Sequence, residues 1–246
     1  MFSFLKDHPF AVEAFFESSL VLTYAVPKEQ LAHLVPECVE VETFDDQWGF
    51  VALAMVQTKN LRPKGFPEYL GNDFFLTGYR VFVRYTDAIG KKYRGLYILK
   101  SETNKRKMEF FGNFFTHYNY STTDITVTET DKHLQIYSKK SGLNVVVSTE
   151  TTEVPLPENS PFENWMEARK FAGPLPFTFT YTPEIQEVLI IEGVRTAWKP
   201  QPVKVLAQHS DFLDSLQLKG MVLANAFIIK NIPYWWKKGR KELWQP

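Results

Sequence analysis

The chain has 246 residues, of which 44% are hydrophobic and 23% charged, proportions that are ordinary for a soluble globular protein. Lys plus Arg and Asp plus Glu both number 28, so bulk charge argues against a nucleic-acid partner. The unusual property is an aromatic content of 15%, including 21 Phe. Because each aromatic ring buries a large apolar area, this content predicts a hydrophobic core with a large stabilising effect.

Cysteine content and the two ends of the chain bear on where the protein works. Cys38 is the single cysteine, so no internal disulfide and no cysteine-based metal cage can form, which fits a reducing cytoplasm. Charged side chains such as Lys6 and Glu13 interrupt the first twenty residues, a pattern not typical of a secretory leader. No apolar run reaches the length that spans a bilayer, and the basic stretch WWKKGRKELW is interpreted as a solvated or packed tail. We expect a cytoplasmic protein.

The first half of the chain predicts one short helix followed by strands. Residues 26–36 have Pro27 in a first helical turn and an apolar face of Leu31, Leu34 and Val35. Alternating or apolar runs then predict strands at 38–44, 48–58, 74–87 and 93–101, with a Pro- and Gly-rich loop at 61–73. The strand at 48–58 is apolar on both faces, so we expect it to be covered on both sides.

The second half predicts two helices among further strands. Residues 103–115 place Met108, Phe111 and Phe115 on one helical face. Residues 160–173 predict a helix with Ser160 as cap, Glu163 completing a capping box and Gly173 as its end. Strand patterns follow at 118–130, 133–140, 143–154, 177–182, 187–198, 203–208 and 226–236. The chain therefore predicts an α+β protein that is mainly antiparallel β.

Motifs that would identify a common chemistry are missing from the sequence. No phosphate-binding glycine loop and no G-x-S-x-G nucleophile elbow is present. The five histidines are scattered without an H-x-x-x-H pair, so we expect no metal site and no cofactor.

A family resemblance rests on several stretches together. They are AVPKEQLAHLVPECVEVETFDDQWGFVALAMVQTKNLRPKGFP, FLTGYRVFVRY with Arg80, and RGLYILKS leading into GNFFTHYNY. Over roughly residues 15–235 the chain resembles the domain of unknown function 2071 family, a branch of the acetoacetate decarboxylase-like superfamily. The resemblance implies an antiparallel β-barrel or cone with peripheral helices and an internal cavity. It also implies a single domain over residues 1–246 and, as in relatives, possible assembly into a homo-oligomer.

The resemblance implies a reactive lysine that this chain lacks. In the decarboxylases a lysine within a Gly-aromatic-Pro-Lys-Lys stretch forms a Schiff base with a β-keto acid, helped by a lowered pKa. The comparable segment here, FFGNFFTHYNY, has neither lysine nor proline. Relatives also often place a glutamate four residues before the strand arginine, where this chain has Leu76. Imine-based decarboxylation is therefore not expected.

Candidate site residues remain around the same segment. Arg80 shares a strand face with Arg84, and an inward-pointing arginine would bind a carboxylate, whereas an outward one would form a surface ion pair. His117 has an unperturbed pKa suited to general acid–base work, or else it is a core or helix-end histidine. Tyr118 is the second candidate for proton transfer.

Three further candidates are ligand-binding residues. In a strand, Tyr118 and Tyr120 would alternate with His117 and Asn119, so one of these two pairs is expected to face the cavity, but the pattern does not say which. Glu68 directly follows the sequence Gly-Phe-Pro in the loop at 61–73. Its side chain would either reach the mouth of the barrel or point to solvent. Glu192 and Arg195 lie on opposite faces of one strand and are poor partners for each other.

Two functions follow from these residues. The first is a binding protein with an internal cavity for a small carboxylate or apolar ligand. The second is a lyase- or hydratase-like enzyme in which Arg80 holds a carboxylate and His117 or Tyr118 moves a proton. The missing nucleophile and metal ligands favour the first. Fold alone does not decide between them.

Overall fold

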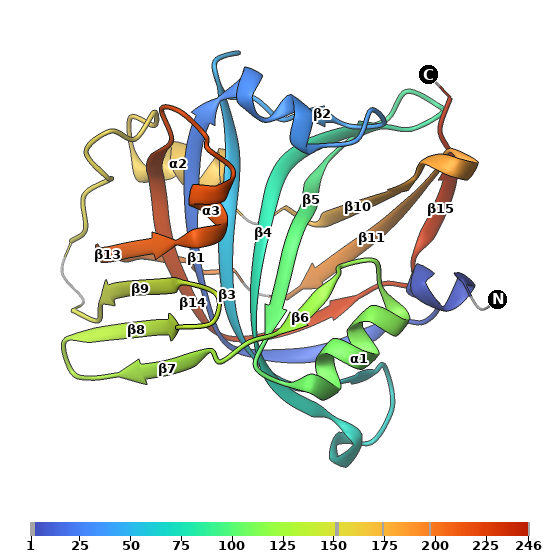
Figure 1. Ribbon diagram of the computed structural model, residues 1–246, viewed down its shortest axis with the longest axis horizontal. Coiled ribbons are helices and arrows are strands. Elements are labelled where there is room, and N and C mark those ends of the chain that lie inside the picture. Colours follow the sequence, from blue (N-terminus) through green and yellow to red (C-terminus); the bar gives the residue numbers. More distant parts are fainter. Residues whose placement is uncertain (1–2, 151–152, 174, 197, 246) are drawn as a thin grey trace.

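The computed structural model describes residues 3–150, 153–173, 175–196 and 198–245, and strands dominate it (Figure 1). The larger sheet has 11 strands and the smaller has four. The strands of the larger sheet are β1 (Val12–Pro27), β2 (Glu40–Val41), β3 (Trp48–Pro63), β4 (Asn72–Thr86), β5 (Lys92–Thr103), β6 (Tyr120–Thr122), β10 (Phe177–Thr182), β11 (Glu187–Arg195), β12 (Gln201–Pro202), β14 (Val222–Trp236) and β15 (Arg240–Leu243).

The smaller sheet and the helices lie around the larger sheet (Figure 1). The smaller sheet contains β7 (Thr126–Glu129), β8 (His133–Ser138), β9 (Leu143–Ser148) and β13 (Val205–Ser210). The α-helices are α1 (Arg106–Phe115), α2 (Trp165–Phe171) and α3 (Asp211–Ser215). Short 3-10 helices are η1 (Ser3–Asp7), η2 (Lys28–Gln30), η3 (Ala32–Leu34), η4 (Glu68–Leu70) and η5 (Pro183–Ile185).

The larger sheet closes on itself. Its strands follow the order β14-β1-β3-β4-β5-β10-β11, and β11 pairs with β14 again. That closing contact joins Gly193 to Trp236, Val194 to Trp235 and Arg195 to Tyr234. Most pairings are antiparallel, with parallel pairing of β5 to β6 and to β10. The result is a ring of seven strands, called the strand ring below, and the mainly antiparallel β prediction is confirmed.

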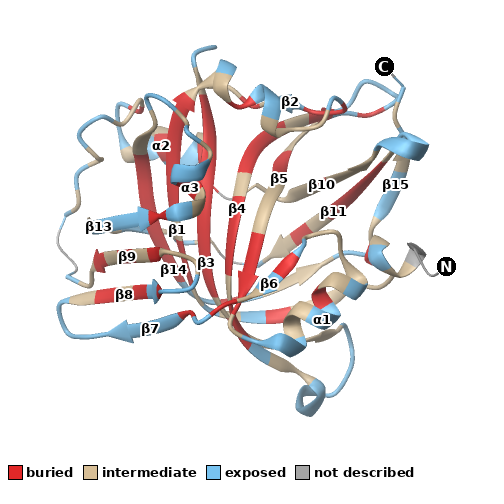
Figure 2. Ribbon diagram, in the orientation of Figure 1, coloured by how far each residue is buried: buried red, intermediate tan, exposed pale blue. Residues whose placement is uncertain are grey.

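Both faces of the central strands are covered, as Figure 2 shows for β1, β3 and β4. On one face Leu53 and Tyr79 share a core with Ile136 and Val145 of the smaller sheet. On the other face a second core holds Phe50, Ala52 and Phe82 of the sheet with Ala168 of α2. The prediction that the strand at 48–58 is buried on both sides is confirmed, because its two faces meet different layers.

The predicted helix at 26–36 is wrong. Strand β1 continues to Pro27, which pairs with Trp48 of β3, and only the short 3-10 helices η2 and η3 follow. Val35 has an extended backbone, as a residue before a proline prefers, so Pro36 ends any helical run at once. Strand β1 is an addition to the predicted elements, and it pairs with both β3 and β14.

Of the strand predicted at 38–44, only the two residues of β2 form a strand. Only Glu40 and Val41 pair with β4, while Glu42 carries a buried carboxylate. The Glu42 carboxylate forms ion pairs with two arginines. Its Oε2 is 2.7 Å from Arg84 Nη2, and its Oε1 is 2.8 Å from Arg94 Nε. The Arg94 guanidinium also lies 4.7 Å from the centre of the Phe171 ring of α2. This charged group therefore joins the β4–β5 hairpin to the neighbouring segments.

The helix predicted at 160–173 starts one turn later than expected. Its N-cap is Asn164, whose side chain accepts a hydrogen bond from Glu167 N, and Glu167 Oε2 accepts one from Glu163 N. Ser160 instead donates to the carbonyl of Ala224. Two overlapping capping patterns, at Ser160 and at Asn164, are present in the sequence, and the second one is used. The helix predicted at 103–115 is confirmed as α1.

Among the described residues, the structure contains no helix that is both long and apolar enough to cross a membrane.

Candidate functional site

The inside of the strand ring holds a chamber of about 120 Å³, called the interior chamber. All seven strands of the ring contribute to its wall. One lining residue from each is Val21 (β1), Ala52 (β3), Arg80 (β4), Leu96 (β5), Thr178 (β10), Arg195 (β11) and Tyr234 (β14). Small side chains such as Ala52 and Ala54 on β3 leave this space open.

The interior chamber carries positive charge and no negative charge among its described lining residues. Arg80 and Arg195 are the two cationic side chains in its wall, and no Asp or Glu is among the described residues that line it. Attraction between a cation and an anion is stronger in such a partly desolvated space than in water. An anionic group beside Arg80 would therefore be attracted to its guanidinium more strongly than in water.

Arg80 is held in place by its own strand and has an unused hydrogen-bond donor. Its Nε is buried and has no hydrogen-bond partner. A Cβ at Gly78 would lie 3.2 Å from both Nε and Nη2 of Arg80, so the guanidinium rests over the bare backbone of that glycine. A buried donor without a partner costs free energy unless a ligand or water satisfies it.

Arg195 reaches the same chamber from the opposite part of the ring, beside Tyr234. A Cβ at Gly193 would overlap the Tyr234 hydroxyl, so this glycine gives the tyrosine its place. Arg195 also lies 4.5 Å from the centre of the Trp198 ring, in a cation–π contact. Burial raises the pKa of Tyr234, and the positive charges of Arg195 and Arg80 partly oppose that rise.

Tyr118 and Tyr120 close the chamber on the side of α1. Asn113 of α1 fixes the backbone of Tyr120 at both ends: its Nδ2 donates to the carbonyl at 2.8 Å and its Oδ1 accepts from the amide at 2.7 Å. A Cβ at Gly112 would overlap the Tyr120 ring, so the helix needs glycine there. Asn119, between the tyrosines, has a left-handed backbone and is exposed.

The tyrosine hydroxyls of the chamber are neutral hydrogen-bonding groups. Burial raises the pKa of Tyr118 far above its usual value and the pKa of Tyr120 to about 12, although Arg80 partly opposes both shifts. Burial likewise raises the pKa of Tyr234. The Tyr118 hydroxyl is buried without a hydrogen-bond partner, although Thr178 lies close to it. These hydroxyls would donate hydrogen bonds to an anion.

A larger cavity of about 360 Å³, called the vestibule, lies next to the interior chamber. It is lined by residues of the segment between η1 and β1, of α1, of η4 and of the adjoining ends of β1, β3 and β4. The two cavities share five lining residues: Phe16, Leu76, Tyr118, Tyr120 and Trp236. Met108, Phe111 and Phe115, the predicted apolar face of α1, line the vestibule.

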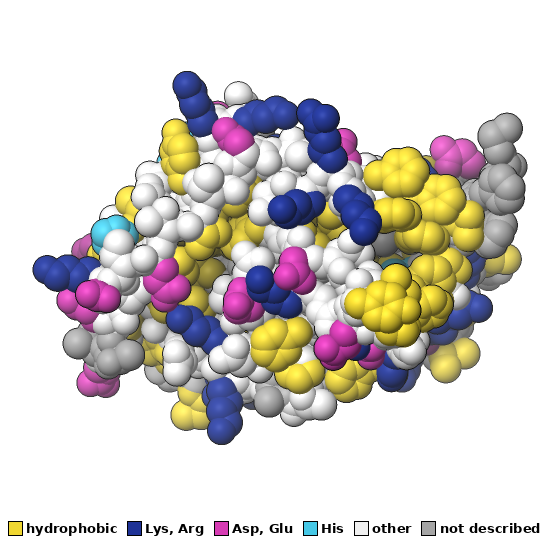
Figure 3. All heavy atoms as spheres, turned by 90° about the horizontal axis from the view of Figure 1, so that it is seen from below, with side chains coloured by type: hydrophobic (Ala, Val, Ile, Leu, Met, Phe, Trp, Pro, Cys, Tyr) yellow, Lys and Arg dark blue, Asp and Glu magenta, His cyan; other side chains and the backbone are white. Residues whose placement is uncertain are grey.

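Exposed apolar side chains lie on α1 and around η4, and two of them, Phe111 and Leu70, line the vestibule. Phe110, Phe111 and Phe114 of α1 are 66%, 43% and 42% exposed, and Phe66 and Leu70 near η4 are also exposed. Figure 3, which looks at the molecule from below, shows hydrophobic side chains gathered on the side where α1 lies. A third chamber, of about 270 Å³, adjoins the interior chamber on the side of α2 and shares Gly173, Trp198 and Phe227 with it.

Of the predicted site residues, the structure brings Arg80, Tyr118 and Tyr120 together at the interior chamber. The other four lie elsewhere: His117, Arg84, Asn119 and Glu68 do not line the described walls of either the interior chamber or the vestibule. His117 Nε2 is 3.1 Å from Asp7 Oδ1, and Asp7 in turn pairs with Lys241. Arg84 pairs with Glu42, and Glu68 lies 3.9 Å from Arg62 with its side chain 82% exposed.

His8 is a buried histidine that sequence reasoning did not select. It lines the vestibule, is 6% exposed, and its Nδ1 has no hydrogen-bond partner. Burial lowers the pKa of His8 from 6.5 to about 4. The unfolded chain therefore binds this proton more readily than the folded protein between these two values.

The pH dependence of stability should report this histidine. The contribution of His8 to the free energy of unfolding is complete above pH 6.5 and is lost as the pH falls toward 4, by up to about 3 kcal/mol. We expect His8→Gln to remove that part of the slope in urea unfolding measured between pH 7 and pH 4. Parallel curves for the two proteins over this interval would contradict the expectation.

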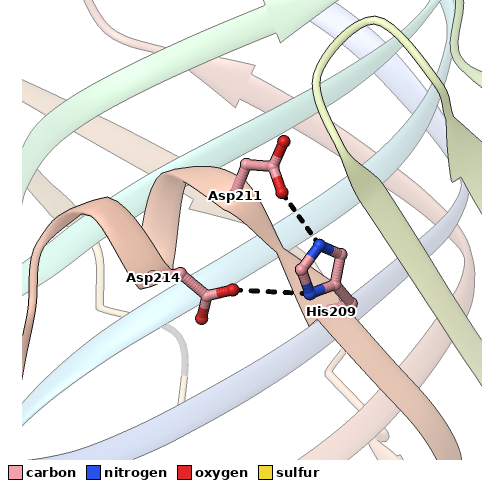
Figure 4. Close-up of side chains that lie close together, drawn as sticks. All are labelled: His209, Asp211 and Asp214. Carbon is pink, nitrogen blue, oxygen red and sulfur yellow. Dashed lines mark hydrogen bonds and ion pairs between the residues drawn. The ribbon is translucent and has the colours of Figure 1, made fainter.

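A surface group of potential metal ligands lies at the start of α3 (Figure 4). His209 Nε2 is 2.8 Å from Asp211 Oδ1, and its Nδ1 is 3.4 Å from Asp214 Oδ2. All three side chains are exposed. His209 and Asp211 are joined by a hydrogen bond, and none of the three side chains lines the described wall of the interior chamber.

The fold has solved counterparts among acetoacetate decarboxylases and similar enzymes. A crystal structure of acetoacetate decarboxylase from Legionella pneumophila superposes with a TM-score of 0.62 at 10% identity, covering 95% of this chain and 88% of that one. An acetoacetate decarboxylase-like enzyme from Sphingomonas wittichii RW1 gives 0.59 at 9% identity, covering 98% and 96%. The enduracididine biosynthesis enzyme MppR, complexed with the condensation product of pyruvate and imidazole 4-carboxaldehyde, gives 0.57 at 9% identity, covering 95% and 89%.

These superpositions show an acetoacetate decarboxylase-like fold. The model of the DUF2071 family, described as an uncharacterized conserved protein, matches residues 14–229. The chain therefore belongs to the DUF2071 family. No curated protein has a significant sequence match to it.

Sequence reasoning missed one arginine and one tyrosine of the polar site. Arg195 and Tyr234 come from β11 and β14, which meet only when the strand ring closes. A signal for Arg195 was available, since Gly193 and Arg195 alternate onto one strand face, and a glycine there marks a close approach. The identity of the approaching residue, Tyr234, depends on a pairing between distant segments that the local pattern does not contain.

Proposed function

We propose that this protein binds a small carboxylic acid inside the strand ring, with the carboxylate between Arg80 and Arg195. The observation that carries the proposal is a buried, unpartnered guanidinium nitrogen on Arg80, in a chamber whose described lining has a second arginine and no acid. An arginine accepts a carboxylate through paired hydrogen bonds. The hydroxyls of Tyr118 and Tyr234 supply further donors.

Binding without chemistry is the function that we favour. A lyase- or hydratase-like reaction needs a group that exchanges a proton with the ligand, and neither His nor Lys is among the described residues that line the interior chamber. His117 is paired with Asp7. Tyr118 does line the chamber, but its raised pKa makes the phenolate costly near neutral pH, so it is a poor general base. The same absence of lysine gives no support to imine chemistry.

The proposal is tested by a thermal-shift screen that matches each acid with its uncharged analogue. The panel holds propionate, butyrate, pyruvate and benzoate beside the corresponding amides or alcohols. An acid at 100 times its dissociation constant should stabilise the protein by about 2.7 kcal/mol, which raises the melting temperature by roughly 5–10 °C. Equal shifts with acids and amides, or no shift with any acid, would contradict carboxylate recognition.

A further inference from the structure

The interior chamber and the vestibule are neighbouring cavities, one with a polar wall and the other mainly apolar. Side chains from β1, β4, β6, β14 and the loop before β6 line both cavities and stand between them. The arginines that favour an anion lie in the interior chamber. Leu76, which lines both cavities, adds an apolar side chain to the path from the interior chamber into the vestibule.

The vestibule presents mainly hydrocarbon to that path. Its apolar wall includes Leu61, Phe74, Met108, Phe111 and Phe115. Two cationic side chains are also present, but Arg62 is paired with Glu13 at 2.9 Å, and Lys107 is exposed on α1. Neither cation is left facing the cavity as an unpaired buried charge. An apolar chain in this space would gain free energy from leaving water.

The volumes set the size of the ligand. The interior chamber, at about 120 Å³, is a third of the size of the vestibule, at about 360 Å³. An acid whose carboxylate occupies the arginine end and whose chain is longer than the interior chamber must extend into a neighbouring cavity. The third chamber is the other exit, but its wall includes Arg169 and Asn225, and Asn225 Oδ1 is buried without a partner. A hydrocarbon chain would leave that oxygen unsatisfied there, as it would leave His8 Nδ1 in the vestibule, so the larger volume of the vestibule, about 360 Å³ against about 270 Å³, decides between the two.

Resting on the function proposed above, we infer that the ligand is a carboxylic acid with an unbranched apolar chain of medium length. Its carboxylate lies at Arg80 and Arg195, and its chain passes Tyr118 and Tyr120 into the vestibule. It enters between α1 and η4, where Phe111 and Leu70 line the vestibule and are exposed. The structure thus points to fatty-acid-like ligands rather than to short keto acids.

The test is a titration calorimetry series with straight-chain acids of three to twelve carbons. Affinity should rise by about fourfold for each methylene that the vestibule buries, and then reach a plateau when the cavity is full. If propionate, hexanoate and decanoate bind with equal affinity, the chain does not occupy the vestibule and the inference fails, while the carboxylate site stands. If no acid of any length binds, the proposed function itself fails.

Two methionines offer a matched pair of variants. Met108 lies on α1 and lines the vestibule, whereas Met166 lies on α2 and lines the third chamber. Met108→Trp should weaken octanoate binding at least tenfold while propionate binding stays within twofold, which also shows that the variant is folded. Met166→Trp should change neither affinity.

The opposite pattern, with octanoate lost in Met166→Trp and kept in Met108→Trp, would place the chain in the third chamber and overturn the inference. Leu61→Trp provides a second blocking variant, since Leu61 lines the vestibule from β3. It carries the test if Met108→Trp does not fold, and the same loss of octanoate with retained propionate is expected of it.

Discussion

Replacement of Arg80 by glutamine is expected to weaken the binding of a carboxylic acid by about 30-fold or more. The Arg80 Nε is buried without a partner in the protein, so its hydrogen bonds and charge are available to the ligand. Removing one partner of a desolvated charge pair typically costs at least about 2 kcal/mol of binding free energy, which corresponds to that factor. The measurement is titration calorimetry with the best acid of the screen and with its amide.

The matched control is Arg84→Gln on the same strand. Arg84 is engaged by Glu42, with its Nη2 at 2.7 Å from Oε2, and does not line the described wall of the interior chamber. This variant should bind the acid normally but lower the free energy of unfolding by about 1–2 kcal/mol, because Glu42 keeps only Arg94. Binding that is lost equally in both variants would place the carboxylate outside the interior chamber. Binding of the amide should be insensitive to both substitutions.

Replacement of Glu42 by glutamine should lower the free energy of unfolding more than Arg84→Gln does. Glu42 is 3% exposed and its carboxylate neutralises two arginines, Arg84 and Arg94. Breaking a buried ion pair by removing one partner leaves uncompensated charge and costs about 3–5 kcal/mol. Since the two arginines are partly exposed, we expect a loss at the lower end, about 3 kcal/mol, measured by urea unfolding.

A solvent-exposed ion pair supplies the comparison for Glu42. Asp46 pairs with Lys28 at 2.5 Å, but the Asp46 side chain is 87% exposed. Asp46→Asn should therefore change the free energy of unfolding by less than about 0.5 kcal/mol. A similar cost for the two substitutions would show that burial of the Glu42 group contributes little.

The parts of the fold that were predictable are those set by local patterns. Strands β3, β4 and β5 follow from alternating and apolar runs separated by turns, and α1 follows from the spacing of Met108, Phe111 and Phe115. The predicted start of α2 lies one turn before the observed start, because two capping patterns overlap in the sequence. The closure of β11 onto β14 is a pairing of distant segments, and no local pattern in either strand specifies its partner.

The candidate site divides in the same way. Alternation along one strand correctly placed Arg80 and Arg84 on one face, but it did not distinguish the one that lines a cavity from the one that meets an acid. The partners that decide this are remote in the sequence: Glu42 lies 42 residues from Arg84, and Asp7 lies 110 residues from His117. The fate of each charged side chain depends on tertiary contacts that only the folded chain creates.

The contact between β11 and β14 that closes the strand ring, called the seam, is short, and ligand binding would affect it. Strands β11 and β14 meet through three residue pairs, and one of those pairs is Arg195 with Tyr234. Arg80 lies on β4, which is separated from β11 in the ring by β5 and β10. An acid held by both arginines would therefore act as a noncovalent cross-link across the hollow of the ring, joining the early-synthesised strands to those made last. Its affinity would measure how completely the seam has closed.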